Sequence, residues 1–113
     1  MKMIYLGHPF GGKRDNVLKS IDLATKLTME NSDVHLFNAA HYFYQYEGVF
    51  AEPEIMKRCL DMVARCDELW LAPGWKNSKG GNQEHEMARQ LKKPVVYLPL
   101  DRHARVEGTS HGE

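Results

Sequence analysis

The fold is decided by residues 68–98, which read E-L-W-L-A-P-G-W-K-N-S-K-G-G-N-Q-E-H-E-M-A-R-Q-L-K-K-P-V-V-Y-L. Two short apolar runs, at 68–72 and 94–98, have the length and composition of buried strands. Between them, residues 73–79 are punctuated as a loop, and a helix is expected over about 81–91. A strand, a helix and a second strand in this order form the repeating unit of a parallel sheet covered by helices.

The rest of the chain continues this alternation. Strands are predicted over 2–6 and 34–37, and helices over about 15–30 and 53–65. Residues 38–52 are the least regular part and carry a dense cluster of aromatic residues. Four strands alternating with helices predict an α/β fold with a parallel sheet, whose ligand site lies outside the carboxyl ends of the strands.

Length and charge limit the class of protein. The chain has 113 residues, which fits a single domain over 1–113, with a polar tail from about Asp101 that we expect to be partly mobile. Lys and Arg total 15 and Asp and Glu total 15, so the net charge is zero and no nucleic-acid polymer is expected as a partner. The chain has no apolar run of membrane-spanning length and no secretory signal, so we expect no membrane association and a cytoplasmic location.

Cysteine and histidine spacing gives no sign of a metal or a disulfide. Cys59 and Cys66 are seven positions apart on a predicted helix, too far apart to be bridged, and are expected to be buried thiols. The six histidines show no H-E-x-x-H spacing and no zinc-binding pattern with cysteine. We therefore expect neither a metal nor a cofactor.

The loop and helix start at 78–84 hold the first candidate site. Ser78, Gly80 and Gly81 precede a helix, whose free N–H groups and dipole suit a phosphate. In the simpler alternative, Ser78 is only an N-cap and the glycines form a tight turn. Glu84 lies about one turn inside the helix and has the chemistry of a glycosyl-transfer nucleophile, although a solvated helix carboxylate is the plainer interpretation.

Two other loops, 7–14 and 38–52, are predicted to reach the same edge of the sheet. The first is glycine-rich but has neither dinucleotide nor triphosphate spacing. His8 and His41 lie on these loops and are candidates for ligand contact. The aromatic residues of the second loop fit stacking on a base or simple core cover. Trp75, in the loop before the last predicted helix, is expected to line a pocket.

Three segments resemble a known family. They read I-Y-L-G-H-P-F-G-G-K-R-D-N at 4–16, C-L-D-M-V-A-R-C-D-E-L-W-L-A-P-G-W at 59–75 and S-K-G-G-N-Q-E-H-E-M-A at 78–88. To about residue 100 the chain resembles the nucleoside 2-deoxyribosyltransferase superfamily, and its small uncharacterised phage and bacterial branch looks closest. That family's nucleophilic Glu follows a Gly by four residues, which places it on Glu84 here.

The resemblance implies both a fold and an activity. The fold is a flavodoxin-like three-layer sandwich with strand order 2-1-3-4 and a possible fifth strand, in a homo-oligomer of two or more subunits. The activity is cleavage or transfer at the N-glycosidic bond of a (deoxy)nucleoside or its 5′-monophosphate, with Glu84 as nucleophile and Tyr5 orienting it. Ser78 resembles the phosphate-binding Ser of deoxynucleoside 5′-monophosphate N-glycosidases. Besides the catalytic Glu84 and Tyr5, the residues expected to bind substrate are Ser78, Gly80, Gly81, Gly7, His8, Phe10, Gly11, Asn16, His41 and Trp75.

The chain departs from that family at two places. The family's catalytic Asp on the second helix aligns nearest to Cys59, with Asp61 two residues further on. The phosphate-binding Ser and Arg of the glycosidase first loop fall on His8 and Phe10. A non-catalytic module that binds a nucleotide or a nucleotide derivative, or a scaffold subunit with an unused pocket, therefore stays open as an alternative to the enzyme.

Overall fold

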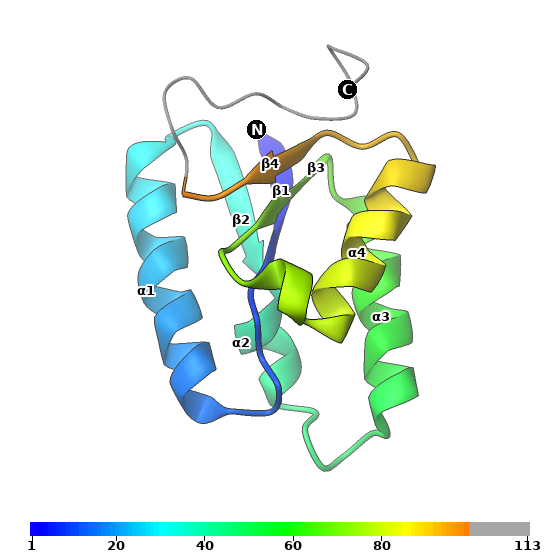
Figure 1. The fold of residues 1–113 in the computed structure, drawn as a ribbon. Coiled ribbons are helices and arrows are strands. Elements are labelled where there is room, and N and C mark those ends of the chain that lie inside the picture. Colours follow the sequence, from blue (N-terminus) through cyan, green and yellow to red (C-terminus); the bar gives the residue numbers. More distant parts are fainter. Residues whose placement is uncertain (100–113) are drawn as a thin grey trace.

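Strands and helices alternate along the chain, as the sequence predicts (Figure 1). The computed structural model describes residues 1–99. The strands are β1 (Lys2–Gly7), β2 (Val34–Asn38), β3 (Glu68–Leu71) and β4 (Val95–Tyr97). The helices are α1 (Arg14–Glu30), α2 (Ala39–Tyr44), α3 (Glu52–Arg65) and α4 (Lys79–Gln90), with a short 3-10 helix, η1 (Trp75–Asn77).

The four strands form one parallel sheet in the order β2-β1-β3-β4. Tyr5 on the central strand β1 is paired with Phe37 on β2 and with Leu69 on β3. The chain leaves β1 in one direction to reach β2 and then crosses back to β3, so the strand order reverses between β1 and β3. The predicted flavodoxin-like α/β fold with order 2-1-3-4 is therefore confirmed, with four strands among residues 1–99.

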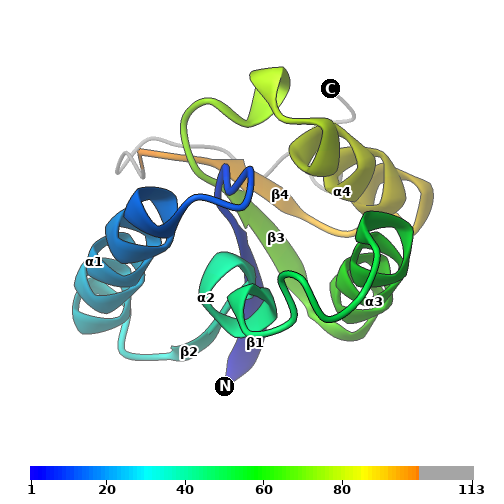
Figure 2. The same ribbon diagram turned by 90° about the horizontal axis from the view of Figure 1, so that it is seen from below.

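Helices cover both faces of the sheet and give it three layers (Figure 2). On one face, Ile4 and Leu6 of β1 pack with Leu27 of α1. On the other, alternate residues of the same strands pack against α3 and α4, among them Tyr5 and Leu69. The period-two alternation of side chains along β1 thus sends Tyr5 toward the α3–α4 face.

The region predicted to be irregular, 38–52, contains a helix that the sequence analysis missed. Asn38 ends β2 and also caps α2, because its Oδ1 accepts a hydrogen bond from the backbone N–H of His41 at 3.3 Å. Ala39, Ala40 and Phe43 form the buried face of this single short helix. A helix of this length is too short for a hydrophobic period to be recognised, and the neighbouring aromatic residues obscured its cap.

The carboxyl ends of β1, β2 and β3 point toward α2 and η1, in the lower half of the molecule in Figure 1. The predicted helix at 81–91 begins slightly earlier, at Lys79, because Ser78 caps it. No helix within residues 1–99 is long and apolar enough to cross a bilayer. The polar tail predicted from Asp101 lies outside the described residues.

Candidate functional site

Glu84 is buried, not solvated. Its α4 neighbours Gly81 and Ala88 are buried as well, at the spacing of three and four that defines one helix face. Only 8% of Glu84 is exposed, whereas Glu86 on the opposite face is exposed and bonds to Gln90. The local pattern of charged residues favoured a surface carboxylate, and the packing of α4 against the sheet overrides it.

The carboxylate of Glu84 meets the hydroxyl of Tyr5. Tyr5 is fully buried on β1, and its hydroxyl donates a hydrogen bond of 2.5 Å to Oε2 of Glu84. The structure therefore brings together the two residues predicted to be catalytic. Because β1 is the central strand and the order reverses beside it, this contact lies where open α/β sheets usually bind ligands.

Gly7 makes room for this carboxylate at the end of β1. A Cβ placed on Gly7 would lie 3.0 Å from Oε1 of Glu84 and 3.0 Å from Cδ2 of Leu71. Both distances are tighter than most real Cβ contacts, so a side chain at Gly7 would require Glu84 and Leu71 to shift. The predicted site residue Gly7 thus contributes by having no side chain.

Burial shapes the acid–base properties of this cluster. It raises the pKa of Glu84 to about 7, and the hydrogen bond from Tyr5 acts in the opposite direction. Burial is also the main reason why the pKa of Tyr5 lies well above its usual value, and the negative charge of Glu84 adds to it. Near neutral pH, the carboxyl group is therefore poised between its two protonation states while the phenol keeps its proton.

Cys59 joins the same cluster, which the sequence analysis did not anticipate. Its side chain is buried in the same apolar cluster as Tyr5, and burial raises the pKa of its thiol to about 12. Cys59 and Cys66 are both buried free thiols, as predicted.

Asp61 does not replace the missing acid, because it is exposed on α3 and pairs with Arg65 at 2.8 Å. Helical spacing of Cys59 and Val63 indicated this buried face of α3, but not that Cys59 lies in one cluster with Tyr5.

Ser78 caps the N-terminus of α4, which is the simpler of the two roles predicted for it. Its Oγ accepts a hydrogen bond of 3.1 Å from the backbone N–H of Gly81, so Ser78 is the N-cap. Gly81 is needed because a Cβ there would lie 2.7 Å from the carbonyl oxygen of Trp75. The first-turn N–H groups of Lys79 and Gly80 have no partner inside the helix, and the Ser78 hydroxyl keeps a proton to donate.

The first loop is held against both other loops. The side-chain amide of Asn16 donates to the carbonyl of Phe10 at 3.0 Å, and the ring of Phe10 packs edge-on against Tyr44 of α2. Gly11 adopts a left-handed φ of 56°, which permits the turn. Pro9 lies next to Gly74 in the third loop. The three loops predicted at the ligand edge therefore converge.

Three further residues predicted to bind substrate make their contacts elsewhere, not with Tyr5 or Glu84. His8 is half-buried, and its Nδ1 is 2.8 Å from the carbonyl oxygen of Pro9. His41 is exposed on α2. Trp75 is half-buried and stacks on Tyr97, with ring centroids 5.6 Å apart and planes at 27°, so it packs against the core as well as the loop. None of these three residues makes a hydrogen bond or a ring contact with Glu84.

Within residues 1–99, no three histidine, cysteine, aspartate or glutamate side chains converge as metal ligands would. In the Tyr5–Glu84 pair, the group that can react is the carboxylate of Glu84. Buried, hydrogen-bonded on one oxygen and near its pKa at neutral pH, Glu84 has the properties of a nucleophile or a general base.

Residues 2–97 match a family described as a domain of unknown function, DUF4406. Because this match spans most of the chain, the protein belongs to that family. A comparison with curated proteins finds no match.

Proposed function

We propose that the protein cleaves or transfers the N-glycosidic bond of a (deoxy)nucleoside or its 5′-monophosphate, with Glu84 as the nucleophile. The observation that carries this proposal is the buried carboxylate of Glu84, held by the Tyr5 hydroxyl where the strand order reverses. The resemblance to nucleoside 2-deoxyribosyltransferases, which places the nucleophile on Glu84 and its orienting Tyr on Tyr5, points to the same pair.

In the first step, a carboxylate oxygen of Glu84 attacks C1′ of the sugar. Oε1 is suited to this role because Oε2 is engaged by Tyr5. The C1′–O bond forms while the C1′–N bond breaks, and the electron pair of that bond leaves with the base, which takes up a proton from solvent. Tyr5 supports the step because its hydrogen bond favours the ionised carboxylate.

In the second step, water or the nitrogen of another base attacks C1′ of the glycosyl ester. The C1′–O bond to Glu84 breaks, the carboxylate is regenerated, and the attacking group loses a proton. Attack by water gives a free sugar, and attack by a base gives a new nucleoside. Two successive displacements retain the configuration at C1′.

Substrate contacts are assigned to the loops around this cluster. The free first-turn N–H groups of α4 and the hydroxyl of Ser78 suit a phosphate or a sugar hydroxyl. The exposed aromatic rings of Tyr42 and Tyr44 on α2 are available to a base.

A non-catalytic nucleotide-binding module is the second candidate, and one observation favours it. The acid that would protonate a departing base is missing: Cys59 lies at the expected place, and Asp61 is exposed and paired with Arg65. Without an internal acid, leaving-group departure relies on solvent and on bases that leave easily. The module would use the same loops without turnover.

Incubation with a panel of nucleosides and 5′-monophosphates, followed by chromatography for free base, separates the two functions. The enzyme predicts base release that Glu84→Gln abolishes, while Glu86→Gln, which changes an exposed carboxylate on the same helix, keeps it. Saturable nucleotide binding without base release, unchanged in both variants, points to the module. Absence of both binding and release contradicts the proposal.

The proposal extends to the oligomeric state and the cellular location of the protein. We propose a homo-oligomer, since α2 and the following loop expose Tyr42, Tyr44 and Val49 to solvent. Sedimentation at several protein concentrations tests it, and a monomer at all of them refutes it. We also propose a cytoplasmic location, with which the two unpaired cysteines agree.

A further inference from the structure

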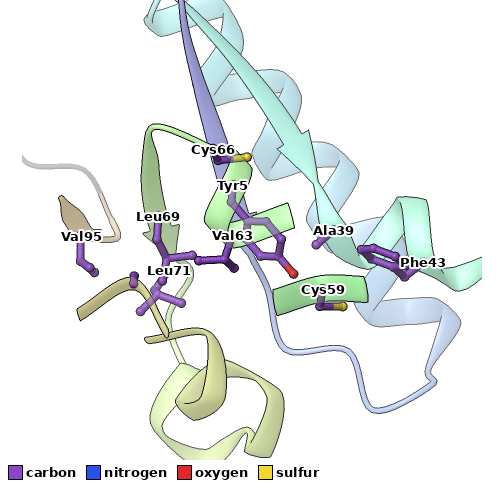
Figure 3. Close-up of a cluster of buried hydrophobic side chains, with 10 residues drawn as sticks. Tyr5, Ala39, Phe43, Cys59, Val63, Cys66, Leu69, Leu71 and Val95 are labelled. Carbon is purple, nitrogen blue, oxygen red and sulfur yellow. The ribbon is translucent and has the colours of Figure 1, made fainter. Parts of the chain in front are cut away.

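The short helix α2 carries the exposed rings of Tyr42 and Tyr44, and its place in the molecule is set by its surroundings. It has six residues, whereas an isolated helix needs about 12 or more to be stable in water. Figure 3 shows Ala39 and Phe43, on the inner side of α2, in the same buried cluster as Tyr5. Because the hydrophobic effect has no direction, this packing holds the helix down without fixing its orientation.

The side-chain amide of Asn38 joins α2 to α1. Its Oδ1 accepts a hydrogen bond from the backbone N–H of His41 at 3.3 Å, and its NH₂ group donates to Oγ of Ser20 at 3.0 Å. Ser20 gives its own proton to the carbonyl oxygen of Val17 at 2.6 Å, which leaves the Oγ lone pairs to accept from Asn38. The opposite orientation of the amide would set its NH₂ group against the N–H of His41, so the direction of both contacts is fixed.

The burial of Ser20 shows that this link is a costly choice for the packing. Ser20 is 0% exposed, on a helix that lies beside α2 (Figure 2). A hydroxyl in such a position loses its hydration, a loss that alanine would avoid. What a fully bonded buried polar pair provides is one defined arrangement of the elements that it joins.

The same face of α1 also holds the first loop. Asn16 lies one helical turn before Ser20, and its amide donates to the carbonyl of Phe10 at 3.0 Å. The ring of Phe10 packs edge-on against Tyr44, with ring centroids 5.9 Å apart. These contacts form a closed circuit from α1 through the first loop to the last residue of α2, and back through Asn38 to α1. Both ends of α2 are therefore tied to one turn of α1.

We propose that Ser20 and Asn38 are positioning residues that hold α2, and with it the ring of Tyr44, against the first loop. The consequence for substrate rests on the proposed function, in which the α2 rings contact the base. In that case the pair determines how tightly the base is held. It leaves the chemistry unchanged, because within residues 1–99 neither side chain shares a hydrogen bond with Tyr5 or Glu84.

Two substitutions break the link from opposite ends. Ser20→Ala removes the acceptor on α1. Asn38→Ser keeps an oxygen that caps α2 but lacks the NH₂ group that reaches Ser20, so it separates the link from the cap. Leu23→Ala is the control, because it removes a partly buried apolar side chain from the same helix and lowers stability while leaving the link in place.

Hydrogen exchange measures the position of α2 without any substrate. We expect exchange at the α2 amides to rise about fivefold in both link variants, the change that loss of one ordinary hydrogen bond predicts, with α3 unaffected. The same variants should raise KM for nucleosides about fivefold, or Kd where no base is released. The kcat and the acidic limb of the pH profile should stay in place, because Tyr5 and Glu84 are untouched.

Each outcome decides the matter. Faster exchange at α2 with a raised KM and an unchanged kcat, in both link variants and not in Leu23→Ala, supports the positioning role. Unchanged exchange at α2, or an equal rise in Leu23→Ala, overturns it, since packing alone would then hold the helix. Faster exchange with an unchanged KM overturns the role in holding the base. If exchange responds but no nucleoside or monophosphate binds or releases base, the link stands and the proposed glycosidic activity fails.

Discussion

The hydroxyl of Tyr5 donates a hydrogen bond to the carboxylate of Glu84, although the two residues are 79 positions apart in the chain. One end of this contact is set by the pleat of β1, which turns Tyr5 toward α4, and the other by the buried face of α4. Gly7 keeps the strand end free of a side chain at the point where the carboxylate arrives.

Glu84→Gln should remove a pH dependence of stability. The folded protein holds the Glu84 proton up to about pH 7, whereas the unfolded chain releases it near the usual value of 4.5. Because the folded state binds more protons in this range, the free energy of unfolding falls as the pH rises from about 4.5 to about 7. A shift of this size corresponds to at most about 3 kcal/mol. The neutral amide avoids this loss, so Glu84→Gln should be the more stable protein at about pH 8.

Urea unfolding at about pH 5 and pH 8 measures this effect. The two proteins should differ little at pH 5 and most at pH 8. Glu86→Gln is the control, because Glu86 is exposed on the same helix. An equal pH dependence in Glu84→Gln and the unmodified protein would show that the carboxyl titrates normally in the folded state.

Tyr5→Phe should raise the pKa of Glu84 above about 7. The hydrogen bond that opposes the effect of burial is lost, so the carboxyl holds its proton to higher pH. Since attack requires the ionised form, the acidic limb of the pH profile for base release should move to higher pH. The buried carboxyl also loses its partner, at a cost in stability of about 1–3 kcal/mol. Tyr44→Phe, an exposed tyrosine, should leave the profile in place, and an unmoved limb in Tyr5→Phe would contradict the coupling.

Gly7→Ala should impair the site more than the fold. The added methyl group would lie 3.0 Å from both Glu84 Oε1 and Leu71 Cδ2, so the carboxylate or the strand end has to move. Overpacking of this kind costs about 1–3 kcal/mol. Gly48→Ala is a useful comparison, because Gly48 has a left-handed φ of 79° and no atom near a new Cβ. We expect Gly48→Ala to lose stability only, and Gly7→Ala to lose base release as well when both are assayed well below their melting temperatures.

Substitutions of Ser78 should separate its two roles. Ser78→Ala removes the N-cap of α4 and should cost about 1 kcal/mol in urea unfolding. Ser78→Asp retains a capping oxygen and should keep that stability. Its negative charge, however, would repel a phosphate at the helix start. Release of base from 5′-monophosphates should then fall strongly in Ser78→Asp while release from nucleosides is kept, and an equal effect on both substrates would argue against a phosphate site.

Local sequence was sufficient for the framework of this protein. Apolar runs such as residues 2–6 and the helical spacing of 15–30 and 53–65 predicted the strands and helices, because both periods are visible within a short window. Alternation of these elements then implied a parallel sheet and a ligand edge. The short helix α2 escaped this reading, since its cap at Asn38 and one buried face occupy too few residues to show a period.

The candidate site depended on the tertiary structure. By local spacing alone, Glu84 was most simply a solvated carboxylate and Ser78 most simply a helix cap. The cap proved to be present, but the carboxylate is buried. Resemblance to a family had placed Tyr5 near the site, yet it marked Cys59 only as the position of a missing acid. The place of Cys59 in the same buried cluster as Tyr5 was not foreseen.

The sequence by itself thus determined which residues form the strands, the helices and the glycine-bearing loops of this α/β protein. Only the tertiary structure decided that Glu84 is buried, that Tyr5 donates to it and that Cys59 lies in the same buried cluster as Tyr5. The physical reason is that periodicity reports on neighbours within a few turns of the chain. The pKa of a carboxyl group, in contrast, is set by desolvation and hydrogen bonds from residues that only the packing of α3 and α4 against β1 brings together.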